Sequence, residues 1–172
     1  CGGDRGRSDR QAAAGRGHRE RGGWVAAGGV GGVGRAVAGA VEGAGAAAGQ
    51  TLAYVHVDSW EAGCQNWTAS FPSEFRARRG YDLRPWLPVF TGRVVGSPEL
   101  SERFLWDVRA TVGELTQDNY LGRLRELAKP HGIQFSTEAY GHLCIDNLTD
   151  AGHADFPISE FWARGDATFP QP

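Results

Sequence analysis

Leu52-Ala53-Tyr54-Val55-His56-Val57 is an apolar run that follows Gly49 closely and stops at Asp58. Its length and its β-branched and aromatic residues predict a short β-strand. A second run of the same kind, Ile133-Gln134-Phe135-Ser136-Thr137, stops at Glu138. Two apolar strands that each end on a carboxylate are the features from which both the fold and the site can be predicted.

The segment between the two runs contains a strong helix signal. Ser97-Pro98-Glu99 combines an N-cap residue, a first-turn proline and a first-turn acid. Apolar residues then recur mostly at steps of three and four: Phe104, Leu105, Val108, Val112, Leu115, Leu121, Leu124 and Leu127. The helix should end near Ala128, before Pro130 and Gly132. Such a helix is the crossover that parallel strands require, so the sequence predicts an α/β fold with a parallel sheet.

Shorter elements are expected around this frame. They are a short helix that starts at Phe71 and stops at Gly80, a third strand at residues 154–157, and a helical turn at residues 159–162. Pro85 and Pro88 predict an irregular conformation for residues 81–90.

The first 48 residues differ in composition from the rest of the chain. Gly and Ala make up more than half of them, and their large apolar side chains are Trp24 and valines. Such a segment has little apolar surface to offset the entropy cost of ordering the chain. We therefore expect residues 1–48 to be a Gly/Ala/Arg-rich low-complexity leader, disordered or mistranslated, and residues 49–172 to be the folded domain.

One motif in this leader supports an alternative function. Gly29-Val30-Gly31-Gly32-Val33-Gly34 satisfies the pattern G-x-G-x-x-G, and Asp58 follows it near the spacing at which a Rossmann fold contacts a ribose. The strand that must precede the motif would be Trp24-Val25-Ala26-Ala27, which is short and follows glycines. A dinucleotide-binding oxidoreductase fragment is therefore the less favoured alternative.

Overall composition excludes several classes of protein. A length of 172 residues suits one domain. The formal net charge of −2 argues against a nucleic-acid partner bound through net positive charge. No apolar run reaches the ~18 residues that a membrane helix needs, so no membrane span is expected. The chain has no methionine, not even at position 1, which indicates a fragment.

The ends of the two predicted strands carry candidate catalytic groups. Because sites collect at the C-terminal ends of parallel strands, we expect Glu61 and Glu138 to lie at one site. Aromatic residues that could pack on a sugar ring are nearby in sequence: Trp60, Trp67, Tyr140 and Trp162. Carboxyl groups beside aromatic faces suit acid/base chemistry on a sugar. A glutamate after a strand can equally be a loop hydrogen-bond acceptor, and His56, within the strand, is expected to be a packed core residue.

Longer strings of sequence carry a family resemblance. They lie in collinear order at residues 55–68, 78–83, 85–88, 101–107, 135–141 and 158–162, and they include Val57-Asp58-Ser59-Trp60-Glu61 and Ser136-Thr137-Glu138-Ala139-Tyr140. These strings resemble the bacterial α-L-rhamnosidases of glycoside hydrolase family 106, over about two thirds of the chain. The resemblance implies a (β/α)8 barrel, present here in part, a calcium-dependent site, and hydrolysis of terminal α-L-rhamnosidic bonds with inversion.

The same resemblance implies roles for individual residues. Glu61 and Glu138 occupy the matching motif positions and are expected to be catalytic, with the choice of general acid left open. Residues expected to contact the sugar are Asp58, Trp60, Trp67, Tyr140, His142, Glu160 and Trp162. Calcium ligands are not assigned, because the candidate oxygen donors Asp146, Asp150 and Asp155 lack the spacing of a calcium-binding loop.

The departures from the family pattern limit this expectation. Family members are longer and carry a further glutamate-bearing strand, which supplies a catalytic carboxylate, beyond the Glu160-Phe161-Trp162 motif. The chain is therefore expected to be a glycosidase fragment that is inactive as truncated, with a carbohydrate as its partner. A noncatalytic sugar-binding remnant is the other alternative. A disulfide between Cys64 and Cys144 would suit a periplasmic or secreted enzyme; the localisation is otherwise open.

Overall fold

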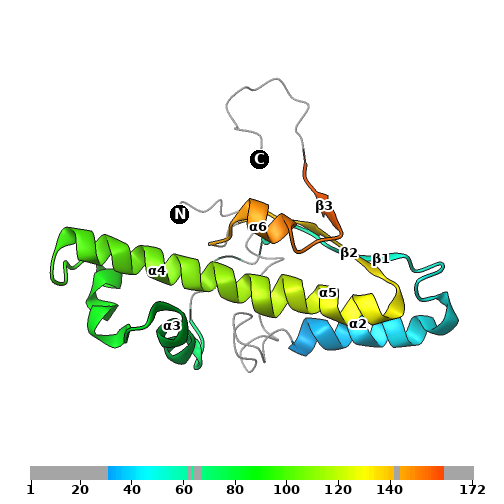
Figure 1. Cartoon of the computed structure of the whole chain (residues 1–172), viewed down its shortest axis with the longest axis horizontal. Helices are drawn as coiled ribbons and strands as arrows, with labels where there is room; N and C mark the ends of the chain where they lie inside the picture. The colour runs from blue at the N-terminus through cyan, green and yellow to red at the C-terminus, as the bar shows by residue number, and fades with distance from the viewer. Residues whose placement is uncertain (1–30, 62, 64–66, 142–143, 161–172) are drawn as a thin grey trace, which may run out of the picture.

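The structure, a computed structural model, describes residues 31–61, 63, 67–141 and 144–160 (Figure 1). Its α-helices are α2 (Gly31–Ala44), α3 (Phe71–Arg79), α4 (Pro98–Thr116), α5 (Gly122–Ala128) and α6 (Asn147–Ala151). Its strands are β1 (Tyr54–Val57), β2 (Gln134–Glu138) and β3 (Phe156–Ile158). Tighter or wider helical turns occupy η1 (Gly45–Ala47), η2 (Arg84–Thr91), η3 (Gln117–Leu121) and η4 (Lys129–His131).

The three strands form one parallel sheet in the order β1-β2-β3. In this sheet Val57 pairs with Thr137, and Glu138 pairs with Ile158. The predicted α/β class and the parallel pairing of the first two strands are therefore confirmed, and the third strand lies two residues later than expected. Among the described residues these three strands make an open sheet, and the barrel stays a prediction.

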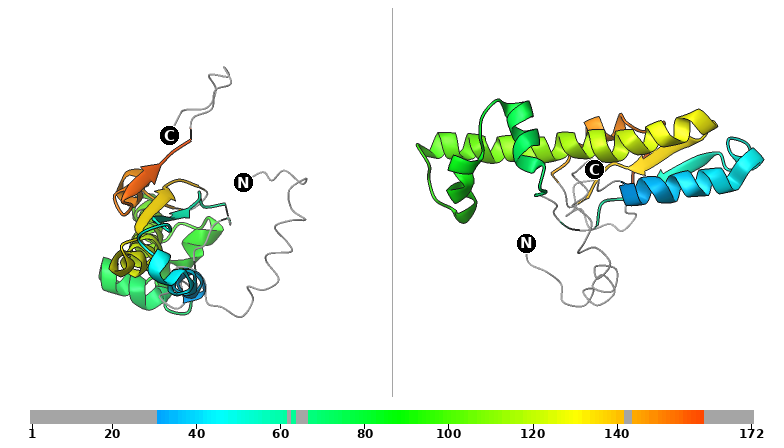
Figure 2. Two further views of the ribbon diagram at one scale, coloured as in Figure 1. Left: turned by 90° about the vertical axis from the view of Figure 1, so that its right-hand side faces the viewer. Right: turned by 90° about the horizontal axis from the view of Figure 1, so that it is seen from below.

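The predicted long helix is confirmed from its first residue. Ser97 is the N-cap, and its hydroxyl oxygen accepts a hydrogen bond from the Leu100 amide at 3.2 Å. The helix continues through α4, η3 and α5 as one rod, which lies beside the sheet and extends beyond it (Figure 2). The pattern did not predict the π-helical turn η3, Gln117–Leu121, in the middle of this rod. Wider turns of this kind are frequent at functional sites.

Three groups of buried apolar side chains hold these elements together. One joins α3 and η2 to α4 and consists of Phe71, Phe75, Leu83, Val89, Phe104, Val108, Val112 and Leu115. The second packs α2 against the end of α5 and consists of Val41, Ala128 and Ile133. The third packs the long helix against β2 and consists of Leu121, Leu124 and Phe135. The long helix contributes to all three groups, so it fixes the position of α3 relative to the sheet.

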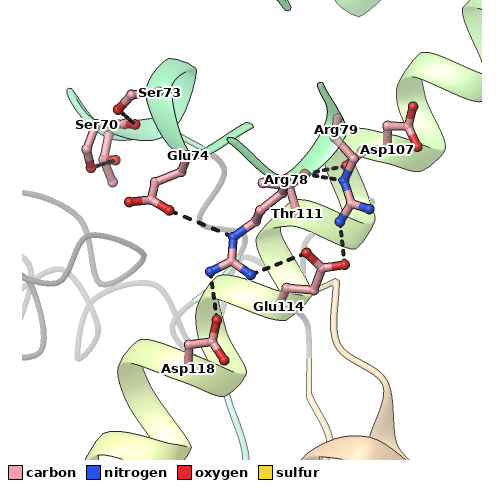
Figure 3. A network of polar contacts seen from close by, with 10 residues as sticks. Ser70, Ser73, Glu74, Arg78, Arg79, Asp107, Thr111, Glu114 and Asp118 are labelled. Carbon is pink, nitrogen blue, oxygen red and sulfur yellow. Dashed lines mark hydrogen bonds and ion pairs between the residues drawn. The ribbon is translucent and has the colours of Figure 1, made fainter. Parts of the chain in front are cut away.

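An ion-pair network also anchors α3 on α4 (Figure 3). Arg78 donates to Asp118 at 2.6 Å and to Glu114 at 3.4 Å. Arg79 pairs with the other oxygen of Glu114 and donates to the Thr111 hydroxyl at 2.9 Å. In the sequence Arg76, Arg78 and Arg79 are most simply a solvated helix face, and this interpretation is wrong for Arg78 and Arg79, whose side chains are only 25% and 18% exposed.

The segment expected to be a leader differs from that expectation where the structure describes it. Residues 31–44 form α2, and Val41 is 2% exposed, packed with Ala128 and Ile133. Although the helix is rich in glycine, it packs through Val41, which is buried, and Val37, which is half-buried. Residues 1–30 lie outside the described residues, as does the strand expected before the glycine motif, so the leader remains a prediction there.

Two smaller expectations are wrong. Residues 84–91 are not irregular but form the 3₁₀ segment η2, in which Pro85 lies in the first turn, where no amide donor is needed. Ser159 and Glu160 are not helical, and the rest of that expected turn lies outside the described residues. Among the described residues, no helix has the length and apolar character that crossing a bilayer requires.

Candidate active site

The C-terminal ends of β1 and β2 bring two carboxyl groups together. The strand register ends at Val57 and Thr137, which places Asp58 beside Glu138. The segments that follow β1 and β2 pair again at an isolated bridge between Trp60 and Gly141. There the Trp60 amide donates a hydrogen bond to the Tyr140 carbonyl at 2.9 Å. The two loops that carry the carboxyl groups are therefore pinned at both ends.

Gly141 is required for this second contact. Its φ is +146°, and a Cβ atom there would lie 2.3 Å from the Trp60 carbonyl oxygen. No other residue type lacks that atom, so only glycine allows the two loops to approach so closely.

The carboxyl groups of Asp58 and Glu138 lie close together, with one oxygen of each within 4.8 Å of the other. The contact with Glu138, helped by the Ser59 amide at 2.8 Å, lowers the pKa of Asp58 below its usual value. Burial, followed by the contact with Asp58, raises the pKa of Glu138. The directions of these shifts mean that, as the pH falls, Glu138 takes up a proton before Asp58 does.

His56 completes a cluster with this pair. One ligand atom each from His56, Asp58 and Glu138 lie within 4.8 Å of one another. The expectation that His56 is a core residue is wrong: it is exposed, and its Nδ1 lies 3.1 Å from the Ser136 hydroxyl. Alternate residues of a strand share a face, so the spacing of His56 and Asp58 was the signal that could have revealed the cluster.

The cluster partly fits calcium. Calcium takes oxygen ligands, preferably carboxylates, and Asp58 and Glu138 offer two that already converge. The imidazole of His56 is a poorer match, since nitrogen ligands suit transition metals. The two carboxyl groups can therefore hold a calcium ion between them, with other ligands completing its shell.

Tyr140 extends the polar site towards β3. Its hydroxyl donates to Glu138 Oε2 at 3.0 Å. Burial, followed by the carboxyl groups of Glu138 and Glu160, raises the pKa of Tyr140 well above its usual value, so it stays a neutral donor. Carboxyl groups that follow all three strands are thus linked into one polar site.

A cavity of about 160 Å³ opens beside these groups. The lining includes the predicted site residues Asp58, Trp60, Glu61, Glu138 and Tyr140. Thr116, Tyr120 and Leu121 of the long helix close one side, and the Trp60 ring meets the Tyr120 ring edge-on at 5.6 Å between centroids. Glu61 and Glu138, which were expected at one site, both line this cavity, and their catalytic role stays a prediction.

Other predicted site residues lie elsewhere or cannot be placed. Trp67 is 46% exposed and packs on Phe71 of α3, at 5.5 Å between ring centroids, and it does not line the cavity. His142 and Trp162 lie outside the described residues. Cys144 is an exposed free thiol, and its expected disulfide partner, Cys64, also lies outside the described residues.

Asp150 also lines this cavity, a position that the sequence pattern did not predict. It is a fully buried lining residue of α6, whose N-cap is Asp146: one Asp146 oxygen accepts from the Leu148 and Thr149 amides. An aspartate N-cap shortly before an acidic residue is a recognisable helix start. That signal predicts the start of α6, but it does not predict that Asp150 lies on the buried side of this helix.

Comparison with known proteins decides the family. A family model described as alpha-L-rhamnosidase, glycoside hydrolase family 106, matches residues 37–171. The chain belongs to this family. The match includes part of α2, both carboxylate-bearing strands and β3, so it supports the glycosidase interpretation over the dinucleotide-binding one.

Individual relatives agree with this family of hydrolases. The chain is 41% identical over 124 residues to a Formosa agariphila protein named "Putative beta-glucuronidase", a match to 72% of this chain and 11% of that protein. Its fold resembles the rhamnosidase of Novosphingobium sp. PP1Y, with a TM-score of 0.58 and 32% identity over 71% of this chain and 13% of that one. The chain therefore spans about an eighth of the length of these relatives.

Proposed function

We propose that this chain forms part of an enzyme that hydrolyses terminal α-L-rhamnosidic bonds with inversion at the anomeric carbon. The observation that carries the proposal is the cavity lined by Asp58, Glu61 and Glu138 at the C-terminal ends of adjacent parallel strands. In this view β1, β2 and β3 are consecutive strands of a (β/α)8 barrel, whose active sites lie at that end.

Glu61 and Glu138 are the catalytic residues in this proposal. Glu61 lines the cavity but is not part of the cluster of His56, Asp58 and Glu138, which leaves it free to protonate the leaving oxygen. Asp58 and Glu138 would hold calcium, which when bound can orient and polarise sugar hydroxyl groups. The family resemblance implies that the carboxylate that activates water lies on a later strand, so the 172-residue chain alone is expected to be inactive.

The charge of the cavity favours a neutral sugar over a uronic acid. Its described lining contains the acidic residues Asp58, Glu61, Glu138 and Asp150, and none of these lining residues is Lys, Arg or His. Even with one calcium ion bound, the four carboxyl groups leave this lining without an excess of positive charge, so it offers nothing to pair with the carboxylate of a glucuronide. Rhamnose is uncharged and has a methyl group in that place. This supports rhamnosides as substrates over the glucuronides after which the Formosa protein is named.

The test compares substrates and leaving groups with the full-length gene product. We expect hydrolysis of 4-nitrophenyl α-L-rhamnoside, no hydrolysis of 4-nitrophenyl β-D-glucuronide, and β-L-rhamnose as the first anomer seen by proton NMR. In Glu61→Gln, kcat should fall about 10²–10⁴-fold with a poor leaving group and far less with 2,4-dinitrophenolate, which leaves without protonation. Glu138→Gln should lose activity with both leaving groups.

Each part of the proposal has its own contrary result. Absence of rhamnoside hydrolysis by the full-length gene product contradicts the function, and α-L-rhamnose as first product contradicts inversion. Equal losses with both leaving groups in Glu61→Gln contradict its role as general acid.

A further inference from the structure

Asp150 is a buried carboxyl group that makes no hydrogen bond of good geometry among the described residues, although the Gln117 side chain lies nearby. Its side chain is 0% exposed, and both of its oxygens are unpaired. Burial raises its pKa to about 6; Gln117 and His153 lie near enough to oppose the rise, and Asp146 reinforces it. Leaving such a group unsatisfied costs free energy, so the structure requires an explanation for it.

Tight packing on the long helix holds Asp150 in place. A Cβ atom on Gly113 would lie 2.9 Å from the Cys144 carbonyl oxygen, and one on Gly122 would lie 3.6 Å from His153 Nδ1. The segment from Cys144 to His153 therefore lies directly on the helix surface at two glycines. Because α6 is fixed by these contacts and by its N-cap, Asp150 has little freedom to turn towards solvent.

The position of Asp150 connects it with the catalytic groups. It lines the same cavity of about 160 Å³ as Glu61 and Glu138, but it belongs to a different element and comes from the helix side of the cavity. A buried acceptor that borders a cavity and lacks a protein donor is suited to a donor that arrives with the ligand.

We propose that Asp150 accepts a hydrogen bond from a hydroxyl group of the bound sugar and so sets the position of the ring beside Glu61 and Glu138. This inference rests on the proposed function and adds a specificity-determining residue to it. A hydroxyl group supplies the donor that both Asp150 oxygens lack, and a sugar without that hydroxyl leaves the carboxyl unpaired. The acidic lining around it requires that the donor be uncharged or cationic, and a sugar hydroxyl meets that requirement.

The first experiment measures binding of L-rhamnose to the full-length gene product by calorimetry at pH 7. Asp150→Leu should raise the Kd at least about tenfold, and Asp150→Asn should raise it less, since an amide oxygen still accepts. Asp146→Asn is the matched control: asparagine caps a helix as well as aspartate does, so α6 keeps its place and the Kd should not change. An unchanged Kd in Asp150→Leu overturns the inference.

The second experiment identifies the hydroxyl group. The kcat/KM values of Asp150→Leu and of the unmodified enzyme are compared for 4-nitrophenyl α-L-rhamnoside and its 2-, 3- and 4-deoxy analogues. On the unmodified enzyme, kcat/KM for one deoxy analogue should be at least about tenfold lower than for the rhamnoside itself. On Asp150→Leu the two values should be nearly equal, because the substitution has already removed the same contact. A merely structural role would give equal losses on both enzymes and would overturn the inference.

The outcomes separate this inference from the proposed function. If the full-length gene product neither binds L-rhamnose nor hydrolyses rhamnosides, the proposed function fails and the inference fails with it. If it does both, and Asp150→Leu lowers the affinity for calcium while the deoxy analogues show no coupling, Asp150 is a cation ligand. In that case the proposed function stands and the sugar contact is wrong.

Discussion

Asp58 and Glu138 lie one residue beyond Val57 and Thr137, the last registered pair of two parallel strands, and one carboxyl oxygen of each lies within 4.8 Å of the other. Two carboxyl groups in contact can be stabilised by a shared proton or by a cation. The position of the pair at the C-terminal end of the sheet, beside the cavity, makes this choice central to the chemistry.

We predict that this pair binds calcium in the full-length gene product. Asp58→Asn and Glu138→Gln each remove one of two converging negative charges, so each should raise the Kd for calcium at least about tenfold, measured by calorimetry. Chelation with EDTA should abolish rhamnoside hydrolysis, and added calcium should restore it. Glu102→Gln, an exposed carboxylate of α4, is the control and should change neither property. Full activity in EDTA would show that the pair serves as a proton-sharing dyad.

The sequence predicted the frame of this site better than its details. The strand ends at Asp58 and Glu138 follow from apolar runs, and their proximity follows from the helix that makes the strands parallel. The pairing of Asp58 with Glu138, rather than of Glu61 with Glu138, depends on a strand register that no local pattern specifies. Gly141 is a clear case: its need for glycine comes from the Trp60 carbonyl, which is distant in sequence.

Misjudged segments have a common physical cause. Residues 31–44 were expected to lack structure because glycine and alanine bury little surface. They nevertheless form a helix, in which Val41 packs against Ala128 and Ile133. In the sequence Asp150 is one acid among several, because its burial depends on which face of α6 meets the long helix. In both cases tertiary contacts override a local preference.

Asp150 should make stability depend on pH in a direction opposite to that of most carboxylates. Folding raises its pKa from 3.8 to about 6, so the folded state binds the proton more tightly than the unfolded state. The stability that this proton contributes is complete below about pH 4 and is lost as the pH rises to about 6. At pH 7.5 the free energy of unfolding of Asp150→Asn should therefore exceed that of the unmodified protein by up to about 3 kcal/mol. At pH 4 the two proteins should differ little.

Urea denaturation at pH 4, 6 and 7.5 measures this difference, with Glu102→Gln, at an exposed carboxylate of α4, as the control. Equal stability of Asp150→Asn and the unmodified protein at all three values would mean that Asp150 finds a donor when the protein is free in solution. Because the same substitution weakens sugar binding in our proposal, a gain in stability with a loss in affinity would distinguish a functional carboxyl group from a structural one.

The arginine network predicts how firmly α3 is held. Arg79, with a side chain 18% exposed, pairs with Glu114 and donates to Thr111. Arg79→Met should lower the free energy of unfolding by about 1–2 kcal/mol, because Glu114 and Thr111 both lose a charged partner. Arg84→Met is the matched control, since Arg84 is 69% exposed and pairs with its near neighbour Asp82. Arg84→Met should lower the free energy of unfolding by less than about 0.5 kcal/mol. An equal decrease in both variants would show that the network does not anchor α3.

Gly113 offers the most direct test of how the helix positions the site. A Cβ atom there would lie 2.9 Å from the Cys144 carbonyl oxygen, which is backbone and cannot rotate away. Gly113→Ala should therefore push the segment that carries Asp150 off the helix and lower the free energy of unfolding by about 1–3 kcal/mol. This loss would exceed the gain of up to about 1 kcal/mol that alanine gives a helix.

Gly39→Ala in α2 is the control, because nothing lies within 4 Å of its Cβ position, and it should be neutral or stabilising. The Kd for L-rhamnose should rise in Gly113→Ala and stay constant in Gly39→Ala, since only the first moves Asp150 relative to the cavity. A destabilised Gly113→Ala protein with unchanged affinity would separate the packing of this segment from sugar binding.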